Sequence, residues 1–252
     1  MKNSFFCKNK FHNLYEAPSH KSKVSSQILY GEKFKILSKD KSWIKIKTSF
    51  DNYIGYIKNL NYINKFNPTH KVFKLKAKIF KRHTVKKINL TKEFLPFASK
   101  ISFIQEYKGF IEYEKNKWIK KTDIKKINHI EKNYLKILKL FLNTKYTWGG
   151  KSYKGIDCSA ILQLFFYYND KFYPRDTKDQ IKYVKKKIKQ IKFKKGDIIF
   201  WKGHVAACIN TTKLIHAYEP KKKVIIMPIN YTIKNIKRTA NLIIKKISNI
   251  EN

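Results

Sequence analysis

Residues 146–159 of the chain read YTWGGKSYKGIDCS. Three glycines within seven residues, Gly149, Gly150 and Gly155, predict a loop that can approach a ligand closely. Apolar residues at helical spacing begin as soon as the loop ends, so we expect a helix from Cys158 to about Tyr168. Cys158 would then lie at a helix N-terminus, where free N–H groups and the helix dipole favour the nucleophilic thiolate.

A nucleophilic cysteine needs a base that is near it in space but not in sequence. His204 opens a predicted strand after a turn at Gly203, and His216 lies on the next predicted strand. If these strands form a hairpin around 210–213, His216 could orient His204. The two histidines share a face only if the loop has an odd number of residues or a bulge intervenes, and the sequence leaves this open.

Outward from this stretch, the sequence divides into an α+β half and an all-β half. A helix is expected at 130–142, and strand-like runs follow Gly196, which indicates helices followed by an antiparallel sheet. The N-terminal half shows short alternating runs between polar breaks, the pattern of half-buried strands in small barrels. The expected domains are two all-β modules at 10–66 and 70–127, a catalytic domain at 128–232 and a C-terminal tail at 233–252.

Five motifs of the C-terminal half resemble those of the NlpC/P60 family of cell-wall cysteine peptidases in order and spacing. They are Tyr146-x-Trp148-Gly149-Gly150, Gly155-x-Asp157-Cys158-Ser159, Pro174-Arg175-Asp176-Thr177-x-x-Gln180, Gly196-Asp197 and Gly203-His204-Val205. The resemblance covers about residues 128–232. It implies a papain-like α+β fold and a triad of Cys158, His204 and His216 that cleaves bonds near D-Glu in murein stem peptides. Ala160 departs from the family, which more often has Gly after Asp-Cys-Ser.

The two N-terminal modules resemble bacterial SH3-like domains. Family members with paired SH3 modules are similar to γ-D-glutamyl-L-diamino-acid endopeptidases, which trim recycled peptides bearing a free N-terminal L-Ala. This subgroup implies an acid and a tyrosine from the first module that close the site, for which Glu32 and Tyr53 are the candidates. It also implies substrate contacts in the catalytic domain, with Asp157 as counter-charge for the peptide's α-ammonium; the implied residues are Tyr146, Asp157, Ser159 and Thr177.

The net charge of +40 is extreme and by itself suggests a polyanionic partner. Lysines are spread along nearly the whole chain beside many Ile and Asn residues, whereas arginine, the preferred residue for base and phosphate forks, occurs only at Arg82, Arg175 and Arg238. We therefore favour a compositional bias of the kind an AT-rich genome produces, with a selected basic surface as the alternative. No specific nucleic-acid partner is predicted.

The three cysteines, Cys7, Cys158 and Cys208, form no CxxC pair, which fits reduced thiols in a cytoplasm better than a disulfide framework or a zinc cluster. No apolar run reaches the roughly 20 residues of a membrane helix, and no secretion leader is recognised at the N-terminus. We expect a cytoplasmic protein without a membrane span, and nothing in the sequence specifies an oligomeric state. No metal or other cofactor is expected, because the remaining histidines lack ligand spacing: His12, His20, His70, His83 and His129.

The favoured mechanism is acyl transfer, in which His204 takes the thiol proton and the Cys158 thiolate attacks the γ-D-Glu carbonyl. The alternative is a non-catalytic SH3-type binding protein for murein fragments or polyanions. The presence of both Cys158 and His204 argues against that alternative.

Overall fold

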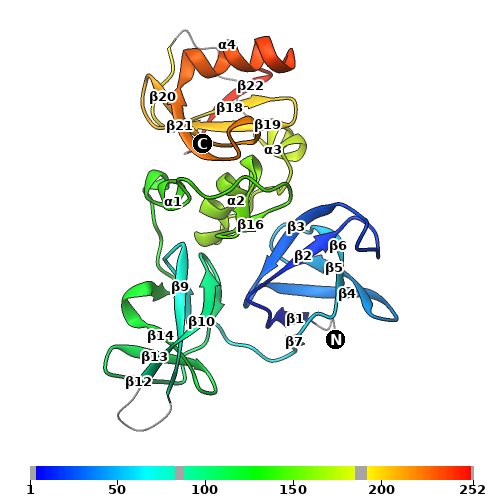
Figure 1. Cartoon of the computed structure of the whole chain (residues 1–252), viewed down its shortest axis with the longest axis vertical. Helices are drawn as coiled ribbons and strands as arrows, with labels where there is room; N and C mark the ends of the chain where they lie inside the picture. The colour runs from blue at the N-terminus through cyan, green and yellow to red at the C-terminus, as the bar shows by residue number, and fades with distance from the viewer. Residues whose placement is uncertain (1–3, 83–87, 185–191, 251–252) are drawn as a thin grey trace. The chain divides into compact units, whose positions relative to one another are not determined.

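The computed structural model describes residues 4–82, 88–184 and 192–250. The chain forms two compact units, Met1–Glu131 and Lys132–Asn252, called here the N-terminal and the C-terminal unit (Figure 1). The N-terminal unit is all-β and the C-terminal unit is α+β, so the predicted fold class is confirmed.

The first module of the N-terminal unit is one antiparallel sheet in the order β3-β2-β6-β5-β4-β1-β7. Period-two alternation along these strands brings Leu14, Ile28, Ile46 and Ile57 together around Phe34 in one buried core. The strands are β1 (Ser4–Cys7), β2 (Phe11–Tyr15), β3 (Val24–Leu29), β4 (Lys33–Asp40), β5 (Trp43–Thr48), β6 (Ile54–Lys58) and β7 (Tyr62–Ile63).

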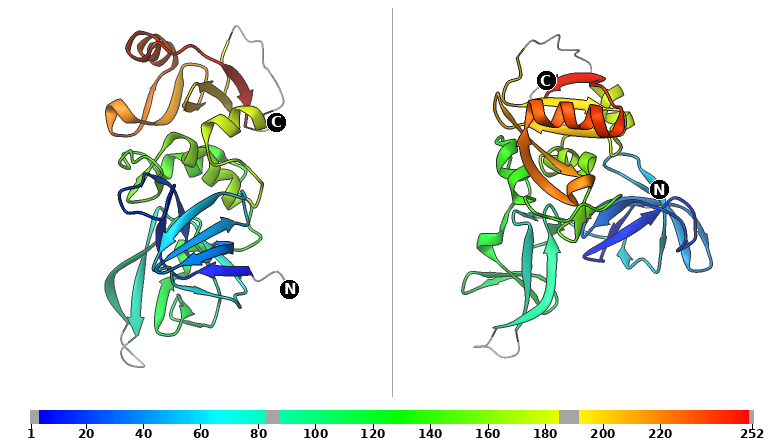
Figure 2. Two further views of the ribbon diagram at one scale, coloured as in Figure 1. Left: turned by 90° about the vertical axis from the view of Figure 1, so that its right-hand side faces the viewer. Right: turned by 45° about the horizontal axis from the view of Figure 1, so that its top comes forward.

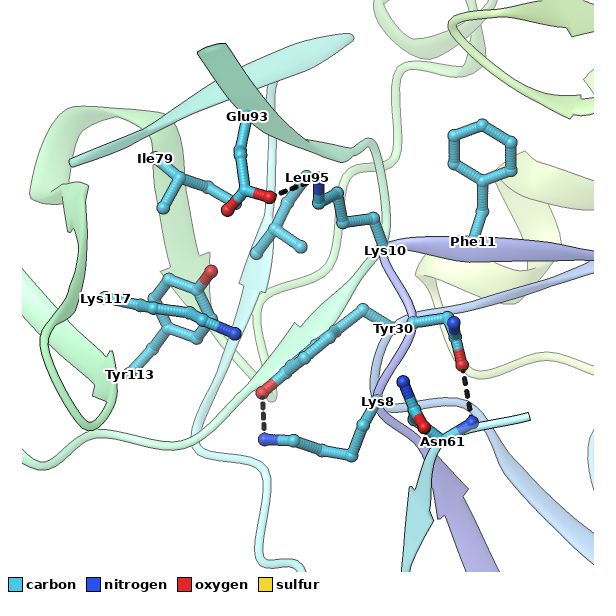
Figure 3. A pocket seen from close by; sticks show the side chains of 11 residues that line it. Lys8, Lys10, Phe11, Tyr30, Asn61, Ile79, Glu93, Leu95, Tyr113 and Lys117 are labelled. Atoms are coloured by element: carbon cyan, nitrogen blue, oxygen red, sulfur yellow. Dashed lines mark hydrogen bonds and ion pairs between the residues drawn. The ribbon is translucent and has the colours of Figure 1, made fainter. Parts of the chain in front are cut away.

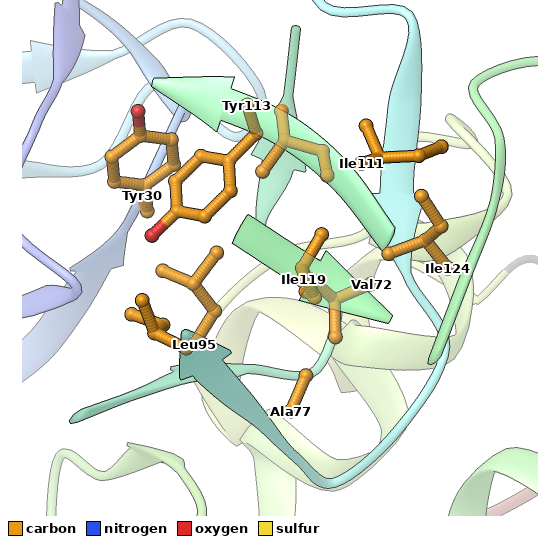
Figure 4. Packing of buried hydrophobic residues seen from close by; sticks show 10 residues of the cluster. Tyr30, Val72, Ala77, Leu95, Ile111, Tyr113, Ile119 and Ile124 are labelled. Atoms are coloured by element: carbon orange, nitrogen blue, oxygen red, sulfur yellow. The ribbon is translucent and has the colours of Figure 1, made fainter. Parts of the chain in front are cut away.

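The second module contains two antiparallel sheets, in the orders β10-β9-β14-β13-β12 and β11-β8-β15. Figure 4 shows the buried residues that the sheets share, among them Val72, Leu95, Ile111 and Ile119. The elements are β8 (His70–Val72), β9 (Lys76–Arg82), β10 (Ile88–Pro96), β11 (Lys100–Ile101), β12 (Gln105–Tyr107), β13 (Phe110–Glu114), β14 (Lys117–Lys120), the 3₁₀ turn η1 (Lys121–Asp123) and β15 (Ile124–Lys126).

The two modules are joined tightly at the turn between β3 and β4. Tyr30 of this turn belongs to the hydrophobic core of the second module, and its carbonyl accepts a 2.9 Å hydrogen bond from the Lys100 N–H. Gly31 follows with φ +75°, and a Cβ atom there would lie 2.1 Å from the Lys100 carbonyl oxygen. Only glycine satisfies both the backbone conformation and this close approach.

The C-terminal unit is built on a five-stranded antiparallel sheet in the order β21-β20-β19-β18-β22. Figures 1 and 2 show this sheet between α4 on one side and α2 on the other. The elements are α1 (Tyr134–Leu140), β16 (Lys151–Ser152), β17 (Gly155–Ile156), α2 (Cys158–Tyr168), α3 (Thr177–Tyr183), β18 (Asp197–Trp201), β19 (His204–Cys208), β20 (Lys213–Tyr218), η2 (Glu219–Lys221), β21 (Lys223–Pro228), α4 (Ile229–Ala240) and β22 (Lys246–Asn249).

The region expected to be a tail, 233–252, instead contains most of α4 and all of β22, and this expectation is corrected. Ile229 and Ile236 of α4 pack into the same buried cluster as Trp201 of β18. The strand β22 pairs with β18 along its length, and Asn249 donates a 3.1 Å hydrogen bond to the buried carboxylate of Asp197. The helix α4 therefore packs against the five-stranded sheet of the C-terminal unit, and β22 is an edge strand of that sheet.

Truncation tests this assignment. A chain ending at residue 245 should lose at least about 2 kcal/mol of unfolding free energy, because several backbone hydrogen bonds disappear and Asp197 loses Asn249. Urea unfolding followed by far-ultraviolet circular dichroism measures this, with a chain ending at residue 250 as control. An unchanged midpoint would restore the interpretation of the region as a tail.

Candidate active site

Asp157 organises the N-terminus of the nucleophile helix. It is the N-cap of α2, and its Oδ1 accepts a 2.8 Å hydrogen bond from the Ala160 N–H. Its Oδ2 accepts a 3.0 Å hydrogen bond from the Gly149 N–H in the glycine loop. One carboxylate therefore fixes both the loop and the first turn, and Cys158 is the first residue of α2, as the sequence predicts.

Arg175 is the partner of Asp157 that sequence reasoning did not assign to the site. Its guanidinium donates two hydrogen bonds to the carboxylate, of 3.0 Å to Oδ1 and 2.7 Å to Oδ2. It also donates to Ser159 Oγ and to the Gly150 carbonyl oxygen. Arg175 and Asp157 are both buried, so a bidentate pair satisfies both charges away from water. The signal available in the sequence was the rarity of arginine in this lysine-rich chain.

These contacts change the roles expected of Asp157 and Ser159. Both carboxylate oxygens of Asp157 are engaged by the protein, and the buried Ser159 hydroxyl donates to Asp157 Oδ1 while it accepts from Arg175. A carboxylate already paired with a guanidinium has little attraction left for a peptide ammonium. The contacts therefore favour a structural role for Asp157 over the counter-charge role predicted from sequence.

The thiol of Cys158 lies against the beginning of β19. Its Sγ is 3.9 Å from the Gly203 carbonyl oxygen, and the thiolate form is favoured by a hydrogen bond from the Val205 N–H. These two backbone groups flank His204. Thr177, the first residue of α3, places its Oγ1 3.9 Å from the same sulfur. Three segments distant in sequence thus meet at the nucleophile.

The register left open by the sequence brings the two histidines together. Ala207 of β19 pairs with Ile215 of β20, so the side chains of these two residues project from the same face of the sheet. His204 and His216 are each an odd number of residues away from this pair. Both histidines therefore project from the other face, on the same side as each other. The Ile209 N–H donates to the Lys213 carbonyl, which leaves the odd three-residue loop 210–212. His204 Nε2 then lies 2.9 Å from His216 Nδ1.

The hydrogen-bonding partners of His216 are compatible with the tautomers that catalysis requires. His216 Nε2 lies 3.3 Å from the sulfur of Met227, a weak acceptor, and its ring stacks on Tyr218 with centroids 4.5 Å apart. If His216 carries its proton on Nε2, its Nδ1 accepts from His204 Nε2–H. The Nδ1 lone pair of His204 is then available to accept the thiol proton. His216 is an uncharged orienting residue in this arrangement.

Burial determines the protonation state of the site. It raises the pKa of the Cys158 thiol to about 11, with the charge of Asp157 acting in the same direction and the Val205 N–H opposing it. Burial lowers the pKa of His204 to about 4. The helix N-terminus led us to expect a low thiol pKa, and this expectation is wrong because desolvation outweighs the local donors. Near neutral pH the resting pair is a thiol and a neutral imidazole.

The remaining predicted substrate-binding residues are divided between the two units of the chain. Tyr146 is partly buried near the nucleophile, and burial raises its pKa with the Cys158 charge as the second cause. Glu32 and Tyr53 belong to the N-terminal unit. The Glu32 carboxylate is buried and accepts a 3.0 Å hydrogen bond from the Leu29 N–H, and the Tyr53 hydroxyl donates to the Ser25 carbonyl at 3.4 Å. Their role in closing the site stays a prediction.

Among the described residues, no group of three or more His, Cys, Asp or Glu side chains is arranged to hold a metal ion. His83 lies outside the described part of the chain. No helix within that part is long and apolar enough to cross a membrane.

A cysteine that begins a helix beside a hydrogen-bonded histidine pair is the arrangement of a thiol hydrolase. Residues 143–240 match the NlpC/P60 family, and residues 14–59 match the bacterial dipeptidyl-peptidase Sh3 domain. The chain is therefore a peptidase that carries an NlpC/P60 domain in its C-terminal unit and a bacterial SH3 domain in its N-terminal unit.

Two relatives align over most of the chain. Dipeptidyl-peptidase 6 of Lysinibacillus sphaericus is 26% identical over 230 residues, covering 81% of this chain and 84% of the relative. Gamma-D-glutamyl-L-lysine dipeptidyl-peptidase of Bacillus cereus is 25% identical over 242 residues, covering 83% and 72%. The chain is thus related to dipeptidyl-peptidases, one of which is named for the gamma-D-glutamyl-L-lysine unit.

A crystal structure of an NlpC/P60 family protein from Bacillus cereus has the same fold. It superposes with a TM-score of 0.77 at 20% identity and covers 90% of this chain and 94% of that protein. An NlpC/P60 endopeptidase from Photobacterium damselae superposes with a TM-score of 0.58 at 12% identity, covering 99% of this chain and 73% of that one.

The protonation state predicts how Cys158 reacts with iodoacetamide. Because the thiol pKa is about 11, the thiolate fraction and the alkylation rate should rise about tenfold per pH unit from pH 6 to pH 9. Mass spectrometry of the Cys158 peptide measures the rate. The Cys158→Ala variant reports the background from Cys7 and Cys208, whose pKa values are also raised by burial. A rate that is already maximal below pH 7 would indicate a thiolate–imidazolium pair instead.

The Arg175→Lys substitution tests the bidentate pair. A lysine keeps the charge but cannot reproduce the fork, so we expect about 1–3 kcal/mol less stability and at least about tenfold lower kcat. Arg238→Lys, on the surface of α4, is the matched control and should leave both quantities unchanged. Wild-type kcat in Arg175→Lys would show that the nucleophile does not depend on the fork.

Proposed function

We propose that this peptidase hydrolyses the γ-D-glutamyl bond of murein stem peptides that carry a free N-terminal L-Ala, through an acyl-enzyme on Cys158. The observation that carries the proposal is the meeting of the Cys158 thiol with the backbone on both sides of His204, whose ring is held by His216. The specificity is supported by the relative that is named a gamma-D-glutamyl-L-lysine dipeptidyl-peptidase.

The chemistry follows from the neutral resting pair. His204 Nδ1 accepts the thiol proton as the sulfur attacks the carbonyl carbon, and the backbone N–H of Cys158 stabilises the negative oxygen. His204 then protonates the leaving amine, and the acyl-enzyme forms. Water, deprotonated by the same imidazole, attacks the thioester and releases the acid. A neutral His216 holds the ring in place throughout.

We propose Asp176 as the partner of the substrate ammonium, because Asp157 is already paired with Arg175. It lies between Arg175 and Thr177, and Thr177 contacts the nucleophile. Burial raises the pKa of the Asp176 carboxyl, and the positive charge of Arg175 opposes this shift. A substrate ammonium bound beside the carboxylate would stabilise its charged form in the same way as Arg175 does. An acetylated terminus would remove the counter-charge and leave the carboxylate desolvated.

A recycling role is part of the proposal. Soluble peptide fragments with a free amine are the expected substrates, and a cytoplasmic location follows from that role. The three free cysteines are consistent with a reducing compartment. A non-catalytic binding function receives no support from a site that retains both the nucleophile and its base.

The test compares L-Ala-γ-D-Glu-L-diamino-acid tripeptides with free and with acetylated N-termini. Loss of a charge pair in a desolvated site costs a few kcal/mol, so we expect kcat/KM to fall about a hundredfold or more on acetylation. Chromatography of the released dipeptide measures both rates, and Cys158→Ala should show none.

Two variants separate the peptidase assignment from the amine assignment. Asp176→Asn should reduce the preference for the free amine, whereas Asp179→Asn, at an exposed position on α3, should keep it. A ratio near one in the wild type would refute recycling while leaving the peptidase standing. Activity that persists in Cys158→Ala would refute the acyl-enzyme itself.

A further inference from the structure

A pocket of about 340 Å³ lies between the two modules of the N-terminal unit. Figure 3 shows its side chains, and we call it the inter-module pocket. Its apolar base consists of Tyr30, Ile79, Leu95 and Tyr113, all of which belong to the core of the second module. The two tyrosine rings meet edge to face, with centroids 5.7 Å apart, and give the base a fixed shape.

Three lysines and one glutamate line the pocket: Lys8, Lys10, Lys117 and Glu93. Lys10 forms a 2.6 Å ion pair with Glu93. Lys8 and Lys117 share the carboxylate of Glu114, which is not among the lining residues. Two carboxylates are thus paired with three ammonium groups, which leaves a net charge of +1 on these five side chains.

The lysines retain donors for a ligand. An ammonium group has three N–H donors. Lys8 directs donors to Tyr30 Oη and Glu114, and Lys117 directs one to Glu114 Oε1 at 2.7 Å. Although burial opposes its charge, hydrogen bonds from Lys117, Lys8 and Tyr30 lower the pKa of Glu114 to about 2, so this carboxylate stays ionised and holds the ammonium groups in position.

The pocket also offers amide groups beside the lysines. Asn9 and Asn61 line it, and the Asn61 N–H donates a 2.8 Å hydrogen bond to Asn9 Oδ1. The ammonium donors, the amides and the tyrosine-lined base therefore converge on one space. A ligand that complements them has a single negative charge, further hydrogen-bonding groups and an apolar portion.

We propose that the inter-module pocket binds a small organic monoanion, whose carboxylate pairs with Lys8 and Lys117 and whose body rests on Tyr30 and Tyr113. Acidic amino sugars and acidic dipeptides both supply this chemistry. All residues that line the pocket belong to the N-terminal unit, and the proposal does not depend on the proposed peptidase specificity.

The test is isothermal titration calorimetry of the full chain carrying Cys158→Ala, so that no probe is turned over. The probes are N-acetylmuramic acid, N-acetylglucosamine, which lacks the carboxylate, and the dipeptide L-Ala-D-Glu. We expect saturable one-site binding of at least one acid and at least about tenfold weaker binding of N-acetylglucosamine, since a charge-assisted hydrogen bond contributes about 1.5–3 kcal/mol. The acid that binds more tightly identifies whether the ligand of the pocket is an acidic amino sugar or an acidic dipeptide.

Variants separate the pocket from the general charge of the chain. Lys117→Gln should weaken acid binding about tenfold, whereas Lys115→Gln, an exposed lysine of the same turn that does not line the pocket, should not. Lys10→Gln alters only a half-exposed ion pair and provides a second variant if Lys117→Gln does not fold. Equal weakening by Lys117→Gln and Lys115→Gln, equal binding of the neutral sugar, or no saturable binding of either acid would overturn the proposal.

Discussion

The carboxylate of Asp157 is the constraint on which the catalytic unit depends. It accepts five hydrogen bonds, from the Gly149 and Ala160 N–H groups, the Ser159 hydroxyl and two nitrogens of Arg175. A buried carboxylate is tolerated only when it is fully paired, and here its partners come from the glycine loop, the first turn of α2 and the segment before α3. The position of the nucleophile is therefore set by electrostatics as much as by packing.

Burial that fixes the nucleophile also suppresses its ionisation. The helix N-terminus and the Val205 N–H favour a thiolate, but desolvation of Cys158 is the larger effect. The same desolvation keeps His204 neutral and able to act as a base. Because the Cys158 thiol and the His204 imidazole are both neutral at rest, the thiol must lose its proton as the sulfur attacks the substrate. This proton transfer depends on the orientation of His204, which the contact with His216 fixes.

The sequence predicted the features that depend on neighbouring residues. The limits of α2, the position of Cys158 and the α+β class follow from glycine spacing, capping and apolar periodicity. Features that depend on distant contacts were missed. The strand β22 is too short to be recognised without β18 beside it, Arg175 acquires a role only when the fold buries it against Asp157, and the thiol pKa depends on burial that local pattern does not report.

The scarcity of acidic residues makes their positions informative. The chain has 57 Lys and Arg but only 17 Asp and Glu, so most cations must rely on water rather than on a partner. Three of these carboxylates lie where segments of the chain join: Asp157 at the nucleophile, Glu114 between the two modules and Asp197 against β22. A compositional drift toward lysine changes the exposed surface at little cost, whereas loss of one of these carboxylates leaves buried donors unpaired. These three acids, more than the abundant lysines, therefore mark places on which the fold and chemistry of this protein depend.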